Sequence, residues 1–247
     1  MTEAALSRTE LLIGAQGLER LREARVCVIG LGGVGSYAVE ALVRAGLQHF
    51  TLIDFDKVGE SNLNRQIIAL QHTIGQPKVE VTRDRILGVN PHAKVLCHQV
   101  FLDETNRPTL LVDNDFYIDA IDSLGPKIGL LEHAVLQGLN IVTVMGAGNR
   151  LDPGSVRISP LHKTHNCPLA RRVRKSLGKR GIRAQIPCVW SAEKPLLPEN
   201  DDDLPDDEPG QQRGRKRRTV GSISYLPAIM GMHAAAWVIN SILDNIE

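Results

Sequence analysis

A glycine-rich turn between an apolar run and a helical pattern constrains the fold of this chain more than any other feature. Residues 25–29 form a short apolar run, and residues 30–35 read GLGGVG. Residues 34–45 follow a helical pattern, which Gly46 is expected to end. A buried strand, a tight glycine turn and a helix are typical of the first half of a strand–helix–strand unit, so the chain is expected to be an α/β protein.

The alternation of strands and helices continues beyond this turn. The pattern predicts further strands at 50–53, 95–98, 116–120 and 141–145, and helices at 9–21, 77–89 and 124–137. In the first of these helices, Leu11, Leu12, Leu18 and Leu21 are expected to share one face. We therefore predict an α/β fold, with a Rossmann-like, doubly wound, mostly parallel sheet in residues 1–160 and a C-terminal extension in 161–247.

The predicted extension has three parts of different composition. Residues 161–183 are basic, residues 195–218 carry an acidic and then a basic run and are expected to form a mobile loop, and residues 223–243 are apolar. The apolar run is nearly long enough to cross a bilayer, but Pro227 and several polar residues, including Ser224, interrupt it. A core or dimer-interface helix is therefore favoured over a membrane segment, and membrane association is the weaker alternative.

Composition excludes some functions and favours one compartment. The formal net charge is +1, so any nucleic-acid binding needs a local basic patch. No two cysteines form a C-x-x-C pair, so no zinc site is expected; the cysteines are Cys27, Cys97, Cys167 and Cys188. The N-terminus lacks the layout of a signal peptide, and we expect a reduced, cytoplasmic protein.

The glycine turn predicts an anion site. Backbone at Gly30, Gly32, Gly33 and Gly35 can approach phosphates closely, and the N-terminus of the following helix favours negative charge. Asp54 follows the next strand, where a carboxylate accepts hydrogen bonds from ribose hydroxyls. The alternative is a turn that serves packing alone.

Two cations then distinguish nucleotidyl transfer from hydride transfer. Arg65 and Lys78 follow the predicted ribose site, and negative charge accumulates on the α-phosphate and the leaving pyrophosphate in a nucleotidyl transfer. Lys78 lies at the start of a predicted helix, from which it can reach the phosphates. The alternative is that both residues are surface cations paired with carboxylates.

Further polar residues are expected at the same edge of the sheet. Asp119 and Asp122 lie at the carboxyl end of a strand, and Asp122 is placed to hold Mg²⁺ between triphosphate oxygens. Asp119 is either a ligand or a cap of the next helix. Asp56 either helps the metal or positions the loop that follows, and Asn64 either binds a phosphate or shapes that loop.

In combination, these motifs resemble the ubiquitin-activating-enzyme-like adenylyltransferase superfamily. The motifs are G-x-G-G-x-G, D-x-D, S-N-x-x-R-Q, G-x-P-K-x-E and D-A-I-D-S, in that order. The resemblance implies that residues 1–160 form an ATP-binding adenylation domain, in which Asp54 binds ribose, Arg65 and Lys78 contact phosphates and Asp122 handles Mg²⁺. It also implies a homodimer in which Arg8 reaches the partner's phosphates, although from the residues alone Arg8 is a surface arginine.

One branch of the superfamily, the tRNA threonylcarbamoyladenosine dehydratases, is similar over nearly the whole chain. The shared segments include R-x-E-L-L-I-G near the N-terminus, P-L-A-R at 168–171 and V-W-S-A-E-K-P at 189–195. This resemblance implies ATP and Mg²⁺ as reactants and tRNA carrying threonylcarbamoyladenosine as the substrate, which is dehydrated to a cyclic form. The chain departs from the branch at Cys167, where members often have Asp.

The resemblance leaves three further expectations open. Cys188 is a candidate nucleophile, with a buried strand thiol as the alternative. Basic residues in 163–183 are either a tRNA-binding patch or a solvated helix face; the patch would contain Arg171, Arg172, Arg174 and Lys175. Rival functions are activation of a ubiquitin-like sulfur carrier, a non-catalytic nucleotide-binding scaffold, and a nicotinamide dehydrogenase. A cysteine desulfurase or acceptor protein is a further candidate partner.

Overall fold

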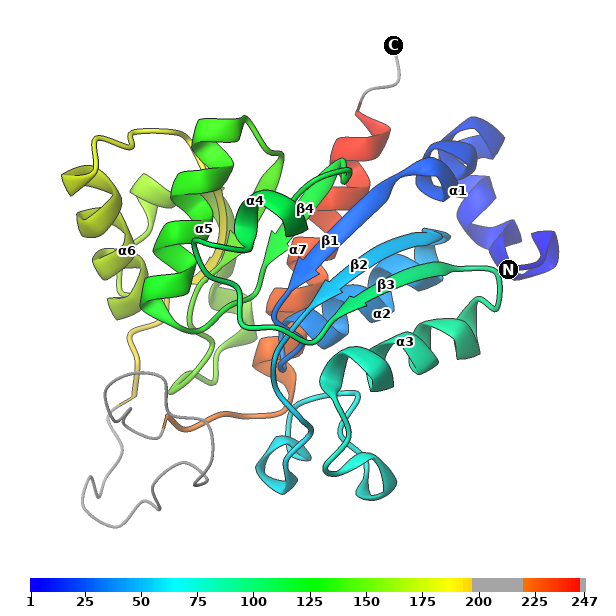
Figure 1. Cartoon of the computed structure of the whole chain (residues 1–247), viewed down its shortest axis with the longest axis horizontal. Coiled ribbons are helices and arrows are strands. Elements are labelled where there is room, and N and C mark those ends of the chain that lie inside the picture. The colour runs from blue at the N-terminus through cyan, green and yellow to red at the C-terminus, as the bar shows by residue number, and fades with distance from the viewer. Residues whose placement is uncertain (197–219, 245–247) are drawn as a thin grey trace.

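The computed structural model describes residues 1–196 and 220–244, and its centre is a seven-stranded sheet in the order β3-β2-β1-β4-β5-β7-β6 (Figure 1). Adjacent strands are parallel except β6 and β7, which are antiparallel. The predicted α/β class and the mostly parallel, doubly wound sheet are confirmed. The strands are β1 (Arg25–Ile29), β2 (His49–Ile53), β3 (Lys94–His98), β4 (Phe116–Asp119), β5 (Ile141–Val144), β6 (Val156–Pro160) and β7 (Pro187–Ser191).

Helices cover both faces of the sheet. Because side chains alternate along a strand, Val26 and Val28 of β1 pack into one apolar layer and Cys27 and Ile29 into the other. The first layer includes side chains of α2 and α7, and the second includes α5 and α6 (Figure 1). The helices are α1 (Glu3–Glu23), α2 (Gly35–Ala45), α3 (Lys78–Val89), α4 (Arg107–Leu110), α5 (Leu124–Gln137), α6 (Pro168–Lys179) and α7 (Tyr225–Leu243).

The apolar C-terminal run forms α7, which is the one described helix long and apolar enough to cross a membrane. Its buried side chains, including Met230, Ala234 and Val238, pack in the layer that also contains α2. A Cβ on Gly231 would lie 2.3 Å from the carbonyl oxygen of Val34, so the two helices approach each other at backbone distance. This packing supports the core role, one of the two roles expected for the run; the dimer-interface role stays a prediction.

The N-terminal helix differs from its prediction. It starts earlier, at Glu3, and Gly14 interrupts it with a left-handed φ of 71°. Because the helix bends there, Leu18 and Leu21 are buried whereas Leu11 and Leu12 are 86% and 87% exposed. The expectation that these four leucines share one buried face is wrong.

The chain beyond residue 160 contributes to the same sheet. β7 inserts between β5 and β6, and α7 covers the face that α2 also covers. The predicted mobile loop at 195–218 lies outside the described residues from position 197 onward.

Candidate active site

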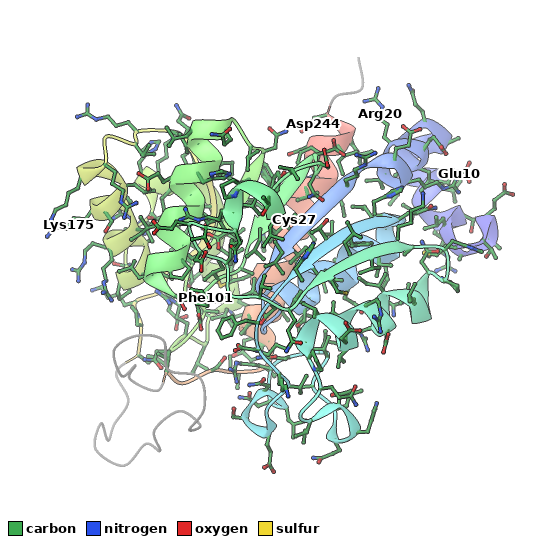
Figure 2. All side chains as sticks on the ribbon, viewed as in Figure 1. Glu10, Arg20, Cys27, Phe101, Lys175 and Asp244 are labelled. Carbon is green, nitrogen blue, oxygen red and sulfur yellow. The ribbon has the colours of Figure 1, made fainter. Side chains whose placement is uncertain are left out.

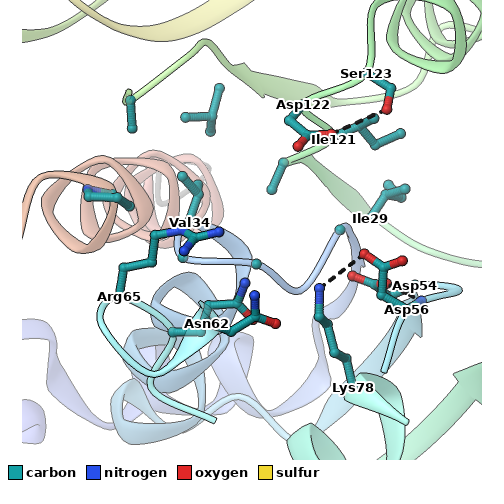
Figure 3. Close-up of a pocket in the computed structure, with 18 of the residues that line it drawn as sticks. Ile29, Val34, Asp54, Asp56, Asn62, Arg65, Lys78, Ile121, Asp122 and Ser123 are labelled. Carbon is teal, nitrogen blue, oxygen red and sulfur yellow. Dashed lines mark hydrogen bonds and ion pairs between the residues drawn. The ribbon is translucent and has the colours of Figure 1, made fainter. Parts of the chain in front are cut away.

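A cavity of about 670 Å³ opens at the carboxyl edge of the sheet (Figure 3). Ligands of open α/β sheets bind at this edge, where the strand order reverses. The cavity wall comes from the glycine turn, the loops that follow β2, β4 and β5, and residues 220–222. The predicted site residues that line it are Gly30, Gly32, Gly33, Asp54, Asp56, Arg65, Lys78 and Asp122.

At two positions of the turn, only glycine fits the backbone geometry. Gly30 has φ 90°, and a Cβ there would lie 2.8 Å from the carbonyl oxygen of Ala120 on the neighbouring loop. A Cβ on Gly35 would lie 1.8 Å from the carbonyl oxygen of Gly30. Gly35 therefore starts α2 behind the turn and does not line the cavity, whereas Gly32 and Gly33 do. The turn presents its backbone to the cavity at the N-terminus of α2, where the helix dipole favours an anion.

Asp54, directly after β2, holds the glycine turn in place through a hydrogen bond. Its Oδ2 accepts a hydrogen bond from the backbone N–H of Leu31 at 2.5 Å, and its Oδ1 accepts one from Asp56 N–H at 2.8 Å. Burial raises the pKa of Asp54, although the nearby Lys78 ammonium acts in the opposite direction. The carboxylate thus joins the glycine turn to the backbone of Asp56, and Asp54 also lines the cavity.

The two predicted cations lie on one side of the glycine turn, and Asp122 lies across the cavity from them (Figure 3). Lys78 is buried at the start of α3, and its Nζ lies 3.0 Å from Asp56 Oδ2. Arg65 donates from one guanidinium nitrogen to the carbonyl of Ser61 at 2.8 Å and to Asn64 Oδ1 at 3.0 Å. A triphosphate bound along the turn would therefore meet two positive charges.

The two acidic residues after β4 have different environments. Asp122 is exposed, lines the cavity and accepts a hydrogen bond from Ser123 Oγ at 3.2 Å. Asp119 is fully buried, and its Oδ2 lies 2.6 Å from both Lys127 Nζ and Thr143 Oγ1. Asp119 therefore anchors the loop that carries Asp122, and it is neither a ligand in the cavity nor the N-cap of α5.

The carboxylate of Asp122 fits a Mg²⁺ ion that also binds substrate phosphates and water better than it fits a metal ion bound only by protein side chains. Within residues 1–196 and 220–244, no three His, Cys, Asp or Glu side chains gather in a metal-binding arrangement. Mg²⁺ at nucleotide sites usually keeps several waters and takes one or two carboxylates together with substrate phosphates. The exposed carboxylate of Asp122 can supply such a ligand.

Three residues in or beside the site were not among those selected from the sequence. Asn62 lines the cavity, whereas Asn64, the predicted residue, does not. Gln66 also lines it, and among the residues that the structure describes its buried Oε1 has no hydrogen-bond partner. Arg150, 4% exposed, donates to backbone carbonyls of Gly146 and Gly148 and so shapes the loop after β5. The R-Q and S-N pairs in the sequence were the available signals for Gln66 and Asn62.

Two other predicted residues lie away from the cavity wall. Arg8 is exposed on α1 and is not among the residues that line the cavity. Cys188 is fully buried in β7, and burial raises the pKa of its thiol far above the ordinary value. Because a nucleophilic cysteine needs access and thiolate character, this environment favours the buried-thiol alternative for Cys188.

The basic segment forms an amphipathic helix, α6, whose buried face contains Val173 and Leu177. Arg171, Arg172 and Lys175 are exposed, and Figure 2 shows Lys175 extending outward from the helix. The fourth predicted residue differs from these three: Arg174 is half-buried and donates to the carbonyl of Thr164 at 2.9 Å. Leu169, in the first turn of α6, lines the cavity, so the basic face begins beside the site.

Comparison with known proteins agrees with this geometry. The model of the ThiF family matches residues 6–247. The tRNA threonylcarbamoyladenosine dehydratase of Bacillus subtilis (strain 168) is 36% identical over 245 residues, which are 98% of this chain and 95% of that protein. The crystal structure of Escherichia coli tRNA N6-threonylcarbamoyladenosine dehydratase in complex with ATP superposes with a TM-score of 0.86 and 31% identity, covering 98% of this chain and 95% of the other.

A second kind of relative matches a smaller part of the chain. The molybdopterin-synthase adenylyltransferase of Escherichia coli (strain K12) is 36% identical over 136 residues, which are 55% of this chain and 54% of that protein. The chain therefore belongs to the ThiF family, and within that family it is similar over nearly its whole length to the tRNA threonylcarbamoyladenosine dehydratases.

Proposed function

We propose that this protein is a cytoplasmic, ATP-dependent dehydratase that cyclises threonylcarbamoyladenosine beside the anticodon of tRNA. One observation carries the proposal: the glycine turn, Asp54, Arg65, Lys78 and Asp122 meet around a single cavity. Supporting it, the chain is similar over 98% of its length to an enzyme of that name, whereas its similarity to a molybdopterin-synthase adenylyltransferase covers 55%.

In the proposed complex the nucleotide lies over the β2 and β1 side of the cavity. The glycine turn and the N-terminus of α2 receive the phosphates, and Asp54 accepts hydrogen bonds from the ribose. Phe55 and Phe101, which line the cavity with ring centroids 5.2 Å apart, offer an apolar wall to the base. The phosphates then point toward Arg65 and Lys78.

The first chemical step is an acyl-adenylation. A carboxylate oxygen of the threonyl group attacks the α-phosphorus of ATP, the bond to the bridging oxygen breaks, and pyrophosphate leaves. Negative charge grows on the transferred and leaving groups, and the cations Arg65 and Lys78 stabilise it. Asp122 would hold Mg²⁺, whose charge offsets that of the triphosphate when the ion is bound.

The second step closes a ring within the substrate. An atom of the carbamoyl group bonds to the activated carbonyl carbon, the carbonyl C–O bond to AMP breaks, and the carbamoyl group releases a proton to solvent. One carboxylate oxygen leaves with AMP, so the nucleoside loses one water in total. The reacting groups belong to one molecule, so their orientation in the cavity supplies much of the rate. No enzyme nucleophile is needed, which agrees with the burial of Cys188.

We propose that the exposed face of α6 binds the tRNA backbone. The first turn of α6 reaches the cavity through Leu169, and contacts from Lys and Arg to phosphates make binding depend on salt. Neutralising Arg171 and Arg172 to Gln should reduce the slope of log affinity against log salt by about 1 to 2. Arg25→Gln/Lys94→Gln, at the amino edge of the sheet, is the matched control. An unchanged slope in the α6 variant would contradict the assignment.

We propose further that two copies of the chain form a homodimer in which Arg8 acts across the interface. Arg8 lies near Leu11 and Leu12, which leave large apolar surfaces exposed on α1. Mixing Arg8→Ala with Lys78→Ala protein should restore part of the activity, because mixed dimers contain one site with both intact residues. If equal mixtures that exchange subunits stay inactive, Arg8 acts within its own subunit or not at all.

The reaction itself is tested with purified protein, ATP and threonylcarbamoylated tRNA, followed by gentle digestion and mass spectrometry of the nucleosides. The proposal predicts that the modified nucleoside loses one water while AMP and pyrophosphate form. ATP binding without any turnover would instead support the scaffold function. Pyrophosphate exchange stimulated by a small protein ending in Gly-Gly, but not by tRNA, would support activation of a sulfur carrier.

A further inference from the structure

One wall of the cavity includes residues 220–222. In the sheet, β2 and β1 lie toward the ribose-binding Asp54, whereas β4 and β5 lie on the other side. Residues 220–222 line the cavity together with Gly146, Ala147 and Gly148, which follow β5. With the nucleoside over β2, this wall faces the space left for the acyl group of the second substrate.

Asn149 holds the wall through two hydrogen bonds. Its backbone N–H donates to the carbonyl of Gly221 at 2.8 Å, and Gly221 N–H donates to Asn149 Oδ1 at 2.8 Å. A Cβ on Gly148 would lie 2.1 Å from the Cγ1 of Val220, so the wall and the loop after β5 are packed tightly. Residues 220–222 are thus held against the loop after β5 by hydrogen bonds and by close packing.

Asn64 connects this wall to the nucleotide side. Its Nδ2 donates to the carbonyl of Ser222 at 3.2 Å, while its Oδ1 accepts from the Arg65 guanidinium at 3.0 Å. Only a side chain with both a donor and an acceptor can make these two contacts at once. A carboxylate of the same size keeps the contact with Arg65 and loses the contact with Ser222.

We infer that Asn64 is a positioning residue that links the phosphate-binding Arg65 to the wall formed by residues 220–222, and so sets the width of the acyl compartment against the triphosphate. The inference rests on the proposed function for the statement that the wall faces the acyl substrate. The link between Asn64, Arg65 and the wall stands on the hydrogen bonds alone.

The test compares Asn64→Asp, Asn64→Ala and Asn149→Ala with wild type, and Asn114→Ala serves as the matched control. Asn114 bonds Thr51 and the carbonyl of Val112, and it does not line the cavity. Hydrogen exchange at residues 220–222, the Kd of ATP without tRNA, and the KM for threonylcarbamoylated tRNA are measured for each protein.

The two substitutions of Asn64 should separate its two contacts. Asn64→Asp should speed exchange at 220–222 and raise the KM for tRNA about three- to tenfold, with the Kd of ATP within about twofold of wild type. Asn149→Ala should show the same pattern. Asn64→Ala should in addition weaken ATP binding about three- to tenfold, because Arg65 loses one of its two acceptors.

The inference is overturned if Asn64→Asp leaves exchange at 220–222 at the wild-type rate, or if it weakens ATP binding as much as Asn64→Ala does. Failure of the proposed function looks different. In that case wild-type protein does not convert the tRNA. Hydrogen exchange at residues 220–222 and the Kd of ATP in the Asn64 variants then decide by themselves whether Asn64 links Arg65 to the wall.

Discussion

Substitution of Lys127 by Met should destabilise the protein strongly, because it leaves a buried carboxylate without its counter-charge. Lys127 and Asp119 are both fully buried, with 2.6 Å between Nζ and Oδ2. Removing one partner of such a pair costs about 3–5 kcal/mol. For a chain of this size, that corresponds to a fall in Tm of roughly 6–20 °C, at about 2–4 °C per kcal/mol.

A double-mutant cycle assigns the loss to the pair. Asp119→Asn should destabilise the protein by a similar amount, since it leaves the Lys127 ammonium buried. The double variant Asp119→Asn/Lys127→Met contains no buried charge at this position. The amide oxygen of Asn can accept from Ile121 N–H, and the amide nitrogen, in the place of the other carboxylate oxygen, can donate to Thr143 Oγ1. We therefore expect it to lose only about 1–2 kcal/mol in urea unfolding. A loss below about 1 kcal/mol for Lys127→Met, or a double variant that loses the sum of both single losses, would refute the reasoning.

Three further predictions concern the cavity and the acid stability of the fold. Lys78→Ala should lower kcat for pyrophosphate release about 100-fold or more, and an unchanged rate would remove Lys78 from the mechanism. Cys188→Ala should retain most of the activity, and its loss with the fold intact by circular dichroism would argue for a catalytic thiol. Burial alone would raise the pKa of Glu40, but hydrogen bonds from Arg85 and Arg44 outweigh it and lower that pKa below its ordinary 4.5. Glu40 should therefore stabilise the fold above about pH 4.5, and this stabilisation should be lost as the pH falls further. In the Glu40→Gln variant, the free energy of unfolding should fall less steeply with decreasing pH below about 4.5 than it does in wild type.

The parts of the fold that were predictable share a strong local signal. Residues 25–29 and 124–137 were predicted with the bounds that the structure gives β1 and α5. In the first segment an apolar run ends at a glycine turn, and in the second a helical pattern ends at Gly138, whose φ is 66°. Local sequence and tertiary structure agree at these elements, so periodicity alone places them.

The errors arise where tertiary contacts decide. Gly14 was read as an ordinary helix position, whereas its left-handed φ of 71° in the structure interrupts the helix. The choice between Asn62 and Asn64 depends on which side of a short turn faces the cavity, and residue spacing does not give that direction. Arg174 belongs to a basic run, yet its partner is the carbonyl of Thr164, ten residues earlier in the chain.

The cavity residues were easier to predict than their partners. Asp54, Arg65 and Lys78 stand in recognisable motifs, and all three line the cavity. Lys127 stands in no motif, because its role comes from burial beside Asp119. Gln66 ends the S-N-x-x-R-Q motif, but the motif alone does not show that its side chain is buried and lines the cavity.

The acyl-adenylate is tested most directly by the fate of one oxygen atom. Threonylcarbamoylated tRNA with oxygen-18 in the threonyl carboxylate is incubated with the protein and ATP, and the AMP is analysed by mass spectrometry. If a carboxylate oxygen attacks the α-phosphorus, one labelled oxygen must leave with AMP as the ring closes. Unlabelled AMP formed alongside the cyclic product would contradict activation of the carboxylate.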